Sequence, residues 1–309
     1  MSVFVVGHSN PDTDSVAAAI AYAHYLKATG TDAVATMQIE ADKLNPESKT
    51  VLQKFGLTAP QALTDAAGKQ VALVDFSDIG QAPANIKEAE VVAIVDHHKI
   101  GDITTNSPIF FYNQPVGCTC TVLMEMFTTN KVDLPKNIAS IMMAAILSDT
   151  VNFKSPTCTE ADKKAVAALK TITGISDTDS LFMEMLKAKS SVDGVPMKDL
   201  VFRDYKDFDM NGKKVGIGQL ELAAVDQVAA IRAGLVNALA DLKKDGRHSV
   251  LFMLTDVVKE GTDLLVVSDE PALIEQAFNA KIQGDSMWVA GMMSRKKQTV
   301  PPLQKAFGC

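Results

Sequence analysis

Short apolar runs alternate with longer amphipathic segments through the first half of the chain. The runs predict buried strands at residues 2–6, 34–37, 71–74 and 91–95. Apolar positions at helical spacing, such as Val16, Ile20 and Ala23, predict helices between and after them. These helices are expected at residues 13–29, 116–130, 136–147, 160–173 and 178–187. Strands that alternate with helices predict a parallel sheet covered on both faces.

The pattern changes after residue 188. Residues 189–194 are short, polar and contain glycine, which is typical of an interdomain linker. Beyond them, Asn211-Gly212 separates two runs that alternate apolar and polar positions, which predicts a hairpin. A helix is expected at 225–243 and strands at 249–257 and 263–268. We therefore expect an α/β protein whose domain 1–188 has a doubly wound, mainly parallel sheet. Domain 195–309 should be a smaller α+β domain with a mixed sheet.

Composition narrows the class of protein. A chain of 309 residues with 47% hydrophobic and 22% charged residues is typical of a globular protein with two cores. The net charge of −7 argues against broad nucleic-acid binding. The sequence begins in an apolar strand, without a signal peptide, and contains no run that could span a bilayer. We expect a cytoplasmic protein with no membrane partner, whose four cysteines are reduced.

Polar side chains with metal-binding groups follow three of the expected strands. Gly7-His8-Ser9-Asn10-Pro11-Asp12-Thr13-Asp14 comes after the first strand, Asp75 ends the third, and Asp96-His97-His98 follows the next. Asp149, after a helix, could complete the group. Sites in parallel sheets form at the carboxyl ends of strands, where such groups are costly unless compensated. Two divalent ions would compensate them and would catalyse phosphate hydrolysis.

Simpler explanations exist for each residue alone. His8 could be an ordinary loop histidine, Asp12 or Asp14 could cap a helix, and Asp75 could begin a turn. Asp96-His97-His98 is harder to explain in this way, and the joint occurrence of all these groups favours metal binding. Mixed imidazole and carboxylate ligands suit manganese, cobalt, iron or zinc better than magnesium. His24, within a helix, and His248, before a strand, are interpreted as structural.

The order of these motifs resembles the DHH phosphoesterase superfamily. The C-terminal run Ser294-Arg295-Lys296-Lys297-Gln298, followed by Val300-Pro301, resembles the manganese-dependent, or family II, inorganic pyrophosphatases. Two further stretches resemble the same family: Pro115-Val116-Gly117-Cys118-Thr119 and Lys154-Ser155-Pro156-Thr157-Cys158-Thr159. The resemblance extends over essentially the whole chain.

The resemblance implies roles for individual residues. His8 and Asp12 would hold one metal ion, and Asp14, His97 and Asp149 a second. Asp75 would bridge the two ions, and His98 would face the leaving phosphate. Phosphate oxygens would be bound by Lys206, Arg295 and Lys296, although Lys213 and Lys214 compete with Lys206 for this assignment. The catalytic residues implied are His98, Asp75 and Asp14.

The implied activity is hydrolysis of inorganic pyrophosphate to two orthophosphates, by a hydroxide shared between two metal ions in a site between the domains. The resemblance further implies two Mn2+ or Co2+ ions per subunit, additional Mg2+ arriving with substrate, a hinge at 189–194, and a homodimer formed through the N-terminal domain. Two alternatives remain. One is another DHH enzyme, a short-chain polyphosphatase or an oligonucleotide phosphoesterase, although the glycine-rich histidine motif typical of those enzymes is absent. The other is a metal-dependent binding protein without catalysis.

Overall fold

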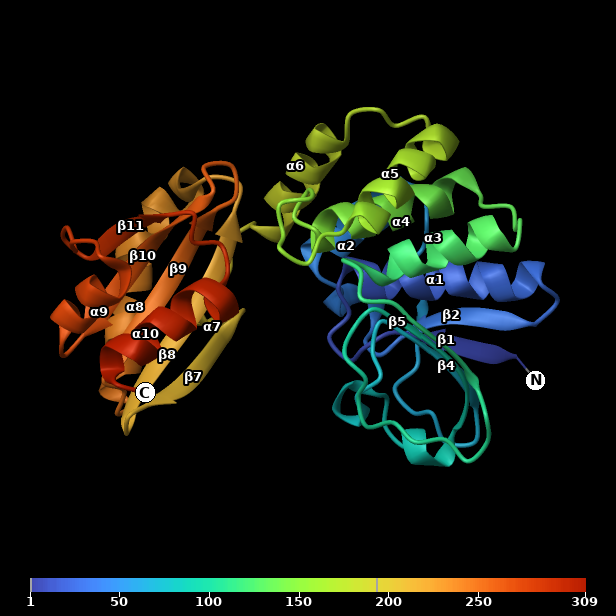
Figure 1. Cartoon of the computed structure of the whole chain (residues 1–309), viewed down its shortest axis with the longest axis horizontal. Helices are drawn as coiled ribbons and strands as arrows, with labels where there is room; N and C mark the ends of the chain where they lie inside the picture. Colours follow the sequence, from blue (N-terminus) through green and yellow to red (C-terminus); the bar gives the residue numbers. More distant parts are fainter. Residues whose placement is uncertain (1, 193) are drawn as a thin grey trace. The chain divides into compact units, whose positions relative to one another are not determined.

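The computed structural model describes residues 2–192 and 194–309, which fold as two compact units (Figure 1). Unit 1 is Met1–Ala188 and unit 2 is Lys189–Cys309. Asp193, part of the expected linker, lies outside the described residues. The start of that linker is bonded to unit 2, because Arg203 donates hydrogen bonds to the carbonyl oxygens of Lys189 and Ser191.

Unit 1 is built on a parallel sheet of six strands in the order β3-β2-β1-β4-β5-β6. The strands are β1 (Val3–Val6), β2 (Ala33–Met37), β3 (Gln61–Ala62), β4 (Gln70–Val74), β5 (Glu90–Asp96) and β6 (Phe110–Asn113). The central strands β1, β4 and β5 are almost wholly buried, which explains why their sequences are continuous apolar runs.

The two faces of this sheet are covered differently. The α-helices lie on one face, where α1 packs on the sheet and α4 packs on α1 (Figure 1). They are α1 (Thr13–Ala28), α2 (Pro46–Lys54), α3 (Thr119–Thr129), α4 (Lys136–Asp149), α5 (Glu160–Thr173) and α6 (Thr178–Lys189), with the 3-10 turn η1 (Ala41–Lys43). The apolar cluster of the other face is closed by connecting loops and the 3-10 turns η2 (Ile79–Gln81) and η3 (Ile86–Glu88).

Unit 2 is a mixed sheet of five strands in the order β11-β10-β9-β8-β7, in which only β8 and β9 are parallel. The strands are β7 (Tyr205–Met210), β8 (Lys213–Leu222), β9 (Ser249–Asp256), β10 (Gly261–Ser268) and β11 (Ser286–Ala290). One apolar core lies under α7 (Met197–Phe202) and α8 (Arg232–Lys244), and a second under α9 (Pro271–Phe278) and α10 (Val300–Phe307). The expected fold class is confirmed for both units.

Several elements differ from the sequence-based expectation. The helix expected at 225–243 begins as the 3-10 helix η4 (Val225–Ile231), and only α8 is a true α-helix. The helix expected at 116–130 begins at Thr119, because the backbone of Cys118 before it is extended, with φ −160° and ψ 142°. Seven elements were not expected: α2, β3, β6, α7, α9, β11 and α10. Most are short or lie at a sheet edge, where periodicity over a few residues is weak.

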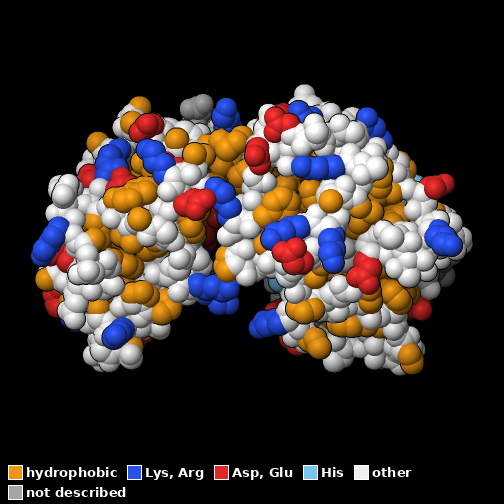
Figure 2. Space-filling model, turned by 45° about the horizontal axis from the view of Figure 1, so that its top comes forward, with side chains coloured by type: hydrophobic (Ala, Val, Ile, Leu, Met, Phe, Trp, Pro, Cys, Tyr) orange, Lys and Arg blue, Asp and Glu red, His pale blue; other side chains and the backbone are white. Residues whose placement is uncertain are grey.

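The surface carries mixed charge. On the face drawn in Figure 2, acidic and basic side chains are interspersed. Among the described residues, none of the helices combines the length and apolar character needed to cross a bilayer.

Candidate metal centre

The site in unit 1 lies where the strand order of the sheet reverses. From β1 the chain continues outward to β2, whereas β4 continues in the opposite direction to β5. Such a switch leaves a crevice at the carboxyl ends of the strands. His8 follows β1, Asp75 follows β4, and His97 follows β5, so one chain direction in three adjacent strands brings these groups together.

Asp75 is the central residue of this group. Its backbone has a left-handed φ of 68°, and its carboxylate is buried. Oδ2 lies 3.4 Å from His8 Nε2, and Oδ1 lies 3.4 Å from His97 Nε2. These distances are long for hydrogen bonds. They match ligand atoms about 2.1 Å from a shared ion, which lie about 3.0–3.5 Å apart. The two oxygens of one carboxylate therefore face two different imidazoles.

A first group of candidate ligands consists of His8, Asp12 and Asp75, whose ligand atoms lie within 4.8 Å of one another. His8 Nε2 is 3.7 Å from Asp12 Oδ2. The other oxygen of Asp12 accepts a 3.0 Å hydrogen bond from the Ser15 amide and caps α1. The capping role and the ligand position coexist, because they use different oxygens.

A second group consists of Asp14, His97 and Asp149, again within 4.8 Å. Asp14 is fully buried, and its oxygens accept hydrogen bonds from the Thr119 amide (2.6 Å) and the Cys120 amide (3.0 Å) at the beginning of α3. The positive end of that helix dipole favours the charged carboxylate. Asp149 is the last residue of α4, which carries it to the same place from the helical layer.

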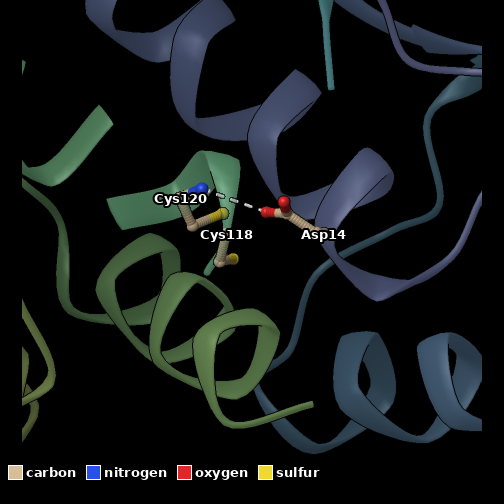
Figure 3. A group of neighbouring side chains, drawn as sticks. All are labelled: Asp14, Cys118 and Cys120. Carbon is tan, nitrogen blue, oxygen red and sulfur yellow. Dashed lines mark hydrogen bonds between the residues drawn. The ribbon is translucent and has the colours of Figure 1, made fainter. Parts of the chain in front are cut away.

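Two thiols also lie beside Asp14. Figure 3 shows Cys120 on α3 and Cys118 in the turn before it, both next to the Asp14 carboxylate. Burial raises the pKa of both thiols well above the usual range, and Asp14 adds to the shift for both. Thiolate ligands select zinc, copper or iron-sulfur clusters, whereas the other candidate ligands here are carboxylates and imidazoles. The cysteines are free, as expected, and we interpret this pair as part of the packing around Asp14.

The ring nitrogens of the two adjacent histidines have different partners. His97 Nδ1 donates to the Val116 carbonyl oxygen (2.9 Å), which leaves Nε2 facing Asp75. His98 Nδ1 donates to Asp96 Oδ1 (2.9 Å), so this nitrogen cannot also bind a cation. Its Nε2 is left for another contact, and the His98 side chain is half exposed. His97 thus points into the group of ligands, whereas His98 borders it.

The pKa values show that these carboxyl groups lie too close together, and are too deeply buried, for all of them to stay ionised without a counter-charge. Burial raises the pKa of Asp14 to about 6, with a further contribution from Asp75, and raises that of Asp149 well above its usual range. His8 and His97 are mostly buried, which alone would lower their pKa values. Contacts with Asp75, and with Asp12 or Asp14, instead raise them to about 10 and 9. A group of this composition fits divalent cations, which would replace the imidazolium protons and stabilise the carboxylates.

Comparison with known proteins identifies the family. The model of the DHH family N-terminal domain matches residues 2–146, and that of the DHHA2 domain matches residues 183–306. A protein of Archaeoglobus fulgidus named "probable manganese-dependent inorganic pyrophosphatase" is 50% identical, over 99% of this chain and 98% of that protein. One of Methanothrix thermoacetophila, named "manganese-dependent inorganic pyrophosphatase", is 45% identical over the same shares. The chain belongs to the family of manganese-dependent inorganic pyrophosphatases.

The fold agrees with this family. A crystal structure of a Methanococcus jannaschii protein, described as a candidate family II inorganic pyrophosphatase, is 40% identical with a TM-score of 0.73. The match covers 100% of each chain.

The residues that support the candidate ligands had no role assigned from the sequence, although Asp96 belongs to the Asp96-His97-His98 motif. Buried Asp96 bonds through Oδ1 to the amides of His97 and His98 as well as to the His98 ring. Thr119 donates to Asp75 Oδ1 (2.9 Å). Glu47 on α2 accepts hydrogen bonds from Thr13 and Ser148, the neighbours of two candidate ligands. The helix start Asn45-Pro46-Glu47 was a readable signal for α2, since Asn45 caps it.

Asp162 supports the same site from α5. Its two oxygens accept from the Gly117 amide at 3.1 and 2.9 Å, and Oδ1 also accepts from Thr121 Oγ1. A Cβ at Gly117 would lie 2.8 Å from Asp162 Oδ2, so only glycine fits there. These bonds fix the turn that carries the Val116 carbonyl group to His97.

The remaining predicted site residues of this family member lie in unit 2. Arg295 begins the π-helical turn η5 (Arg295–Thr299), and exposed Lys296 follows it. Lys206 is exposed on β7, opposite Ile217 of β8. Lys213 and Lys214 pair with Glu270 (2.6 Å) and Asp207 (3.2 Å). Among the described residues Lys206 has no acidic partner, which favours it over its two rivals as an anion-binding residue.

Proposed function

We propose that this chain is a manganese-dependent inorganic pyrophosphatase, which hydrolyses pyrophosphate to two orthophosphates. The observation that carries the proposal is the orientation of Asp75, whose two carboxylate oxygens face His8 and His97. A carboxylate placed in this way is suited to bridge two cations. The names of full-length relatives at 45–50% identity support the same activity.

We assign the metal ligands by group. His8 and Asp12 would hold one Mn2+ ion, and Asp14, His97 and Asp149 the other, with Asp75 shared. Each ion then has carboxylate and imidazole ligands, a set that suits Mn2+. When bound, such a pair of ions polarises phosphoryl oxygens and lowers the pKa of water enough to supply a nucleophile near neutral pH.

The protein's own residues would supply orientation and charge. His98 Nε2 is free because Asp96 holds Nδ1, so this nitrogen can donate a proton or a hydrogen bond to the leaving phosphate. The cations of unit 2, Lys206, Arg295 and Lys296, would bind phosphate oxygens. Arginine offers a planar pair of donors, whereas lysine offers a point charge.

Further proposals follow the family resemblance. They are two Mn2+ ions per subunit, with Co2+ able to replace them, and Mg2+ arriving with the substrate. We also propose a cytoplasmic homodimer formed through unit 1, a hinge within 189–194, and no nucleic-acid or membrane partner.

The test is a hydrolysis assay on metal-free protein to which Mn2+ is returned in measured steps. Activity on pyrophosphate should rise until two equivalents are bound, and tripolyphosphate and a dinucleotide should be cleaved far more slowly. Comparable cleavage of the dinucleotide would favour the oligonucleotide phosphoesterase. Comparable cleavage of tripolyphosphate would favour the polyphosphatase. Metal binding without hydrolysis of any of the three would favour a binding protein.

A further inference from the structure

Arg295 is fixed within unit 2 by three hydrogen bonds. Its Nη1 donates to the carbonyl oxygens of Asp204 (2.8 Å) and Ile217 (3.3 Å), and its Nη2 donates to Asp204 Oδ1 (2.6 Å). The arginine side chain is only 11% exposed, whereas that of Asp204 is 53% exposed. A half-exposed ion pair stabilises a fold little. The geometry of this contact is therefore more informative than its contribution to stability.

The three bonds leave one edge of the guanidinium group available. A guanidinium carries five N–H groups. Asp204 takes the end formed by Nη1 and Nη2, and Ile217 takes the other hydrogen of Nη1. The N–H of Nε and the second N–H of Nη2 remain, and they lie side by side on one edge. Among the described residues no acceptor is bonded to this edge. Two parallel donors of this kind match two oxygens of a phosphate.

The same bonds place this edge close to another candidate for phosphate binding. Asp204 lies two residues before Lys206, and Ile217 is the residue that pairs with Lys206 across β7 and β8. Arg295 is therefore attached to the strand pair that carries Lys206, although the two are far apart in sequence. The lysine is exposed and unpaired among the described residues, and it belongs to the strand pair to which Arg295 is bonded.

We propose that Asp204 is a positioning residue, which holds Arg295 so that its Nε–Nη2 edge binds a phosphate group of the substrate. The proposal rests on the proposed function, since it names how one of its phosphate-binding residues is oriented. Asp204 does not contact the substrate itself. Free rotation of the long arginine side chain would otherwise have to be lost when the substrate binds, and prior orientation removes that cost.

The test compares Asp204→Ala and Asp204→Asn in the full chain loaded with Mn2+. Asp204→Ala removes one of the three acceptors, and we expect KM for pyrophosphate to rise about 10-fold with kcat changed less than about threefold. A contact made equally to substrate and transition state affects KM in this way. Asp204→Asn keeps an acceptor oxygen, so its KM should stay within about threefold of wild type. If Asp204→Ala does not fold, Asp204→Ser replaces it with the same expectation.

Asp207→Ala is the matched control. Asp207 lies on the adjoining strand β7 and accepts hydrogen bonds from Arg247 Nε (2.8 Å) and Nη2 (2.9 Å), so its removal breaks a similar ion pair without touching Arg295. Its KM should be unchanged. In an Arg295→Ala background, Asp204→Ala should have no further effect on KM.

Three results would overturn the positioning role. They are an unchanged KM in Asp204→Ala, a lowered KM, which would make Asp204 a competitor of the substrate, and an equal rise in the Arg295→Ala background. Failure of the proposed function is distinct, because the wild-type protein would then not hydrolyse pyrophosphate at all.

Discussion

The metal centre of unit 1 and the basic segment of unit 2, residues 294–298, are built in different ways. In the candidate metal centre Asp14, Asp75 and Asp96 are buried, and hydrogen bonds hold their carboxylates, as the amides of α3 hold Asp14. In the basic segment, hydrogen bonds fix the backbone, whereas the lysine side chains are exposed. Gln298 accepts from the amides of Met293 and Ser294 and donates to Gly291, while Lys296 remains exposed.

The difference corresponds to what each region would bind. Ions need ligand atoms at fixed positions within a few tenths of an ångström, which buried and mutually bonded groups provide. A phosphate group can be bound by long, mobile lysines, because a point charge acts from many directions. Arg295 is the exception in the basic segment, since Asp204 and Ile217 hold it as firmly as any ligand in unit 1. The predictions below test this contrast.

The largest effects on activity are expected from substitutions of His97 and His98, which we assign to metal binding and to proton donation. His97→Ala removes a buried ligand, so it should weaken Mn2+ binding and lose most activity at micromolar metal, with partial recovery at high metal; Asp149→Ala should behave alike. His98→Gln should keep Mn2+ affinity and lower kcat by about 10²–10⁴-fold, the range for a lost general acid. Titration of the metal-free protein and phosphate release at saturating substrate measure the two quantities. Equal loss of metal binding in both histidine variants would contradict the division.

The pH dependence of metal binding tests the electrostatics of unit 1. His8 and His97 have pKa values of about 10 and 9 in the metal-free protein, so both are protonated at pH 7–8. Binding needs neutral imidazoles, so these two histidines must release about two protons, and Asp149, whose pKa is also raised, can only add to that count. The combined affinity for two ions should then rise about 100-fold per pH unit up to about pH 9. It should rise more slowly between about 9 and 10, and stop rising from these groups above that. Calorimetry in buffers of different ionisation enthalpy counts the protons, and a count near zero would refute the assignment.

Much of the candidate metal centre could be predicted from the sequence, because the buried strands determine where the residues after them lie. A buried run such as that ending at Val74 fixes where the following residue lies, and the topology then aligns the ends of β1, β4 and β5. His8, Asp75 and His97 follow these strands and could be selected in this way, whereas Asp149 stands at the end of α4 and could not. The supporting groups Thr119 and Asp162 could not, because their side chains bond to partners 44 and 45 residues away. Their residue types carry no periodic signal.

Asp96→Asn should have a smaller effect than loss of a ligand. Asp96 Oδ2 is buried without a hydrogen-bond partner in the structure, so the amide group of asparagine would leave donors unsatisfied or turn the ring of His98. Loss of such a supporting group typically costs 10–100-fold in activity. We expect kcat to fall by that factor, with Mn2+ affinity changed less. Asp102→Asn is the control, because exposed Asp102 accepts, among the described residues, only from the Ile79 amide after a neighbouring strand. Equal effects of both variants would contradict the role.

Unit 2 was harder to derive. The Asn211-Gly212 hairpin, β9 and β10 were correctly expected, whereas α7, α9, β11 and α10 were not. Each is short, from five to eight residues. The basic segment was selected only through a family resemblance, because five consecutive polar residues are typical of any solvated turn. The contact between Arg295 and Asp204 joins residues 91 positions apart, and no local pattern predicts it.

The smallest effect is expected from the exposed lysines of the basic segment. Lys296→Ala should raise KM for pyrophosphate about three- to tenfold at low ionic strength, and Lys297→Ala should leave it nearly unchanged. Both lysines are exposed and adjacent, so the pair isolates the position of the charge from its presence. The difference should shrink as salt approaches physiological strength, because the Debye length there is about 8 Å and an exposed charge is screened.

The Asp204→Ala effect on KM should depend less on salt, since Arg295 is mostly buried. KM measured for all three variants at several salt concentrations decides the matter. Equal salt dependence of Lys296→Ala and Asp204→Ala would show that the basic segment acts as one diffuse charge, and the contrast between a fixed arginine and mobile lysines would then be wrong.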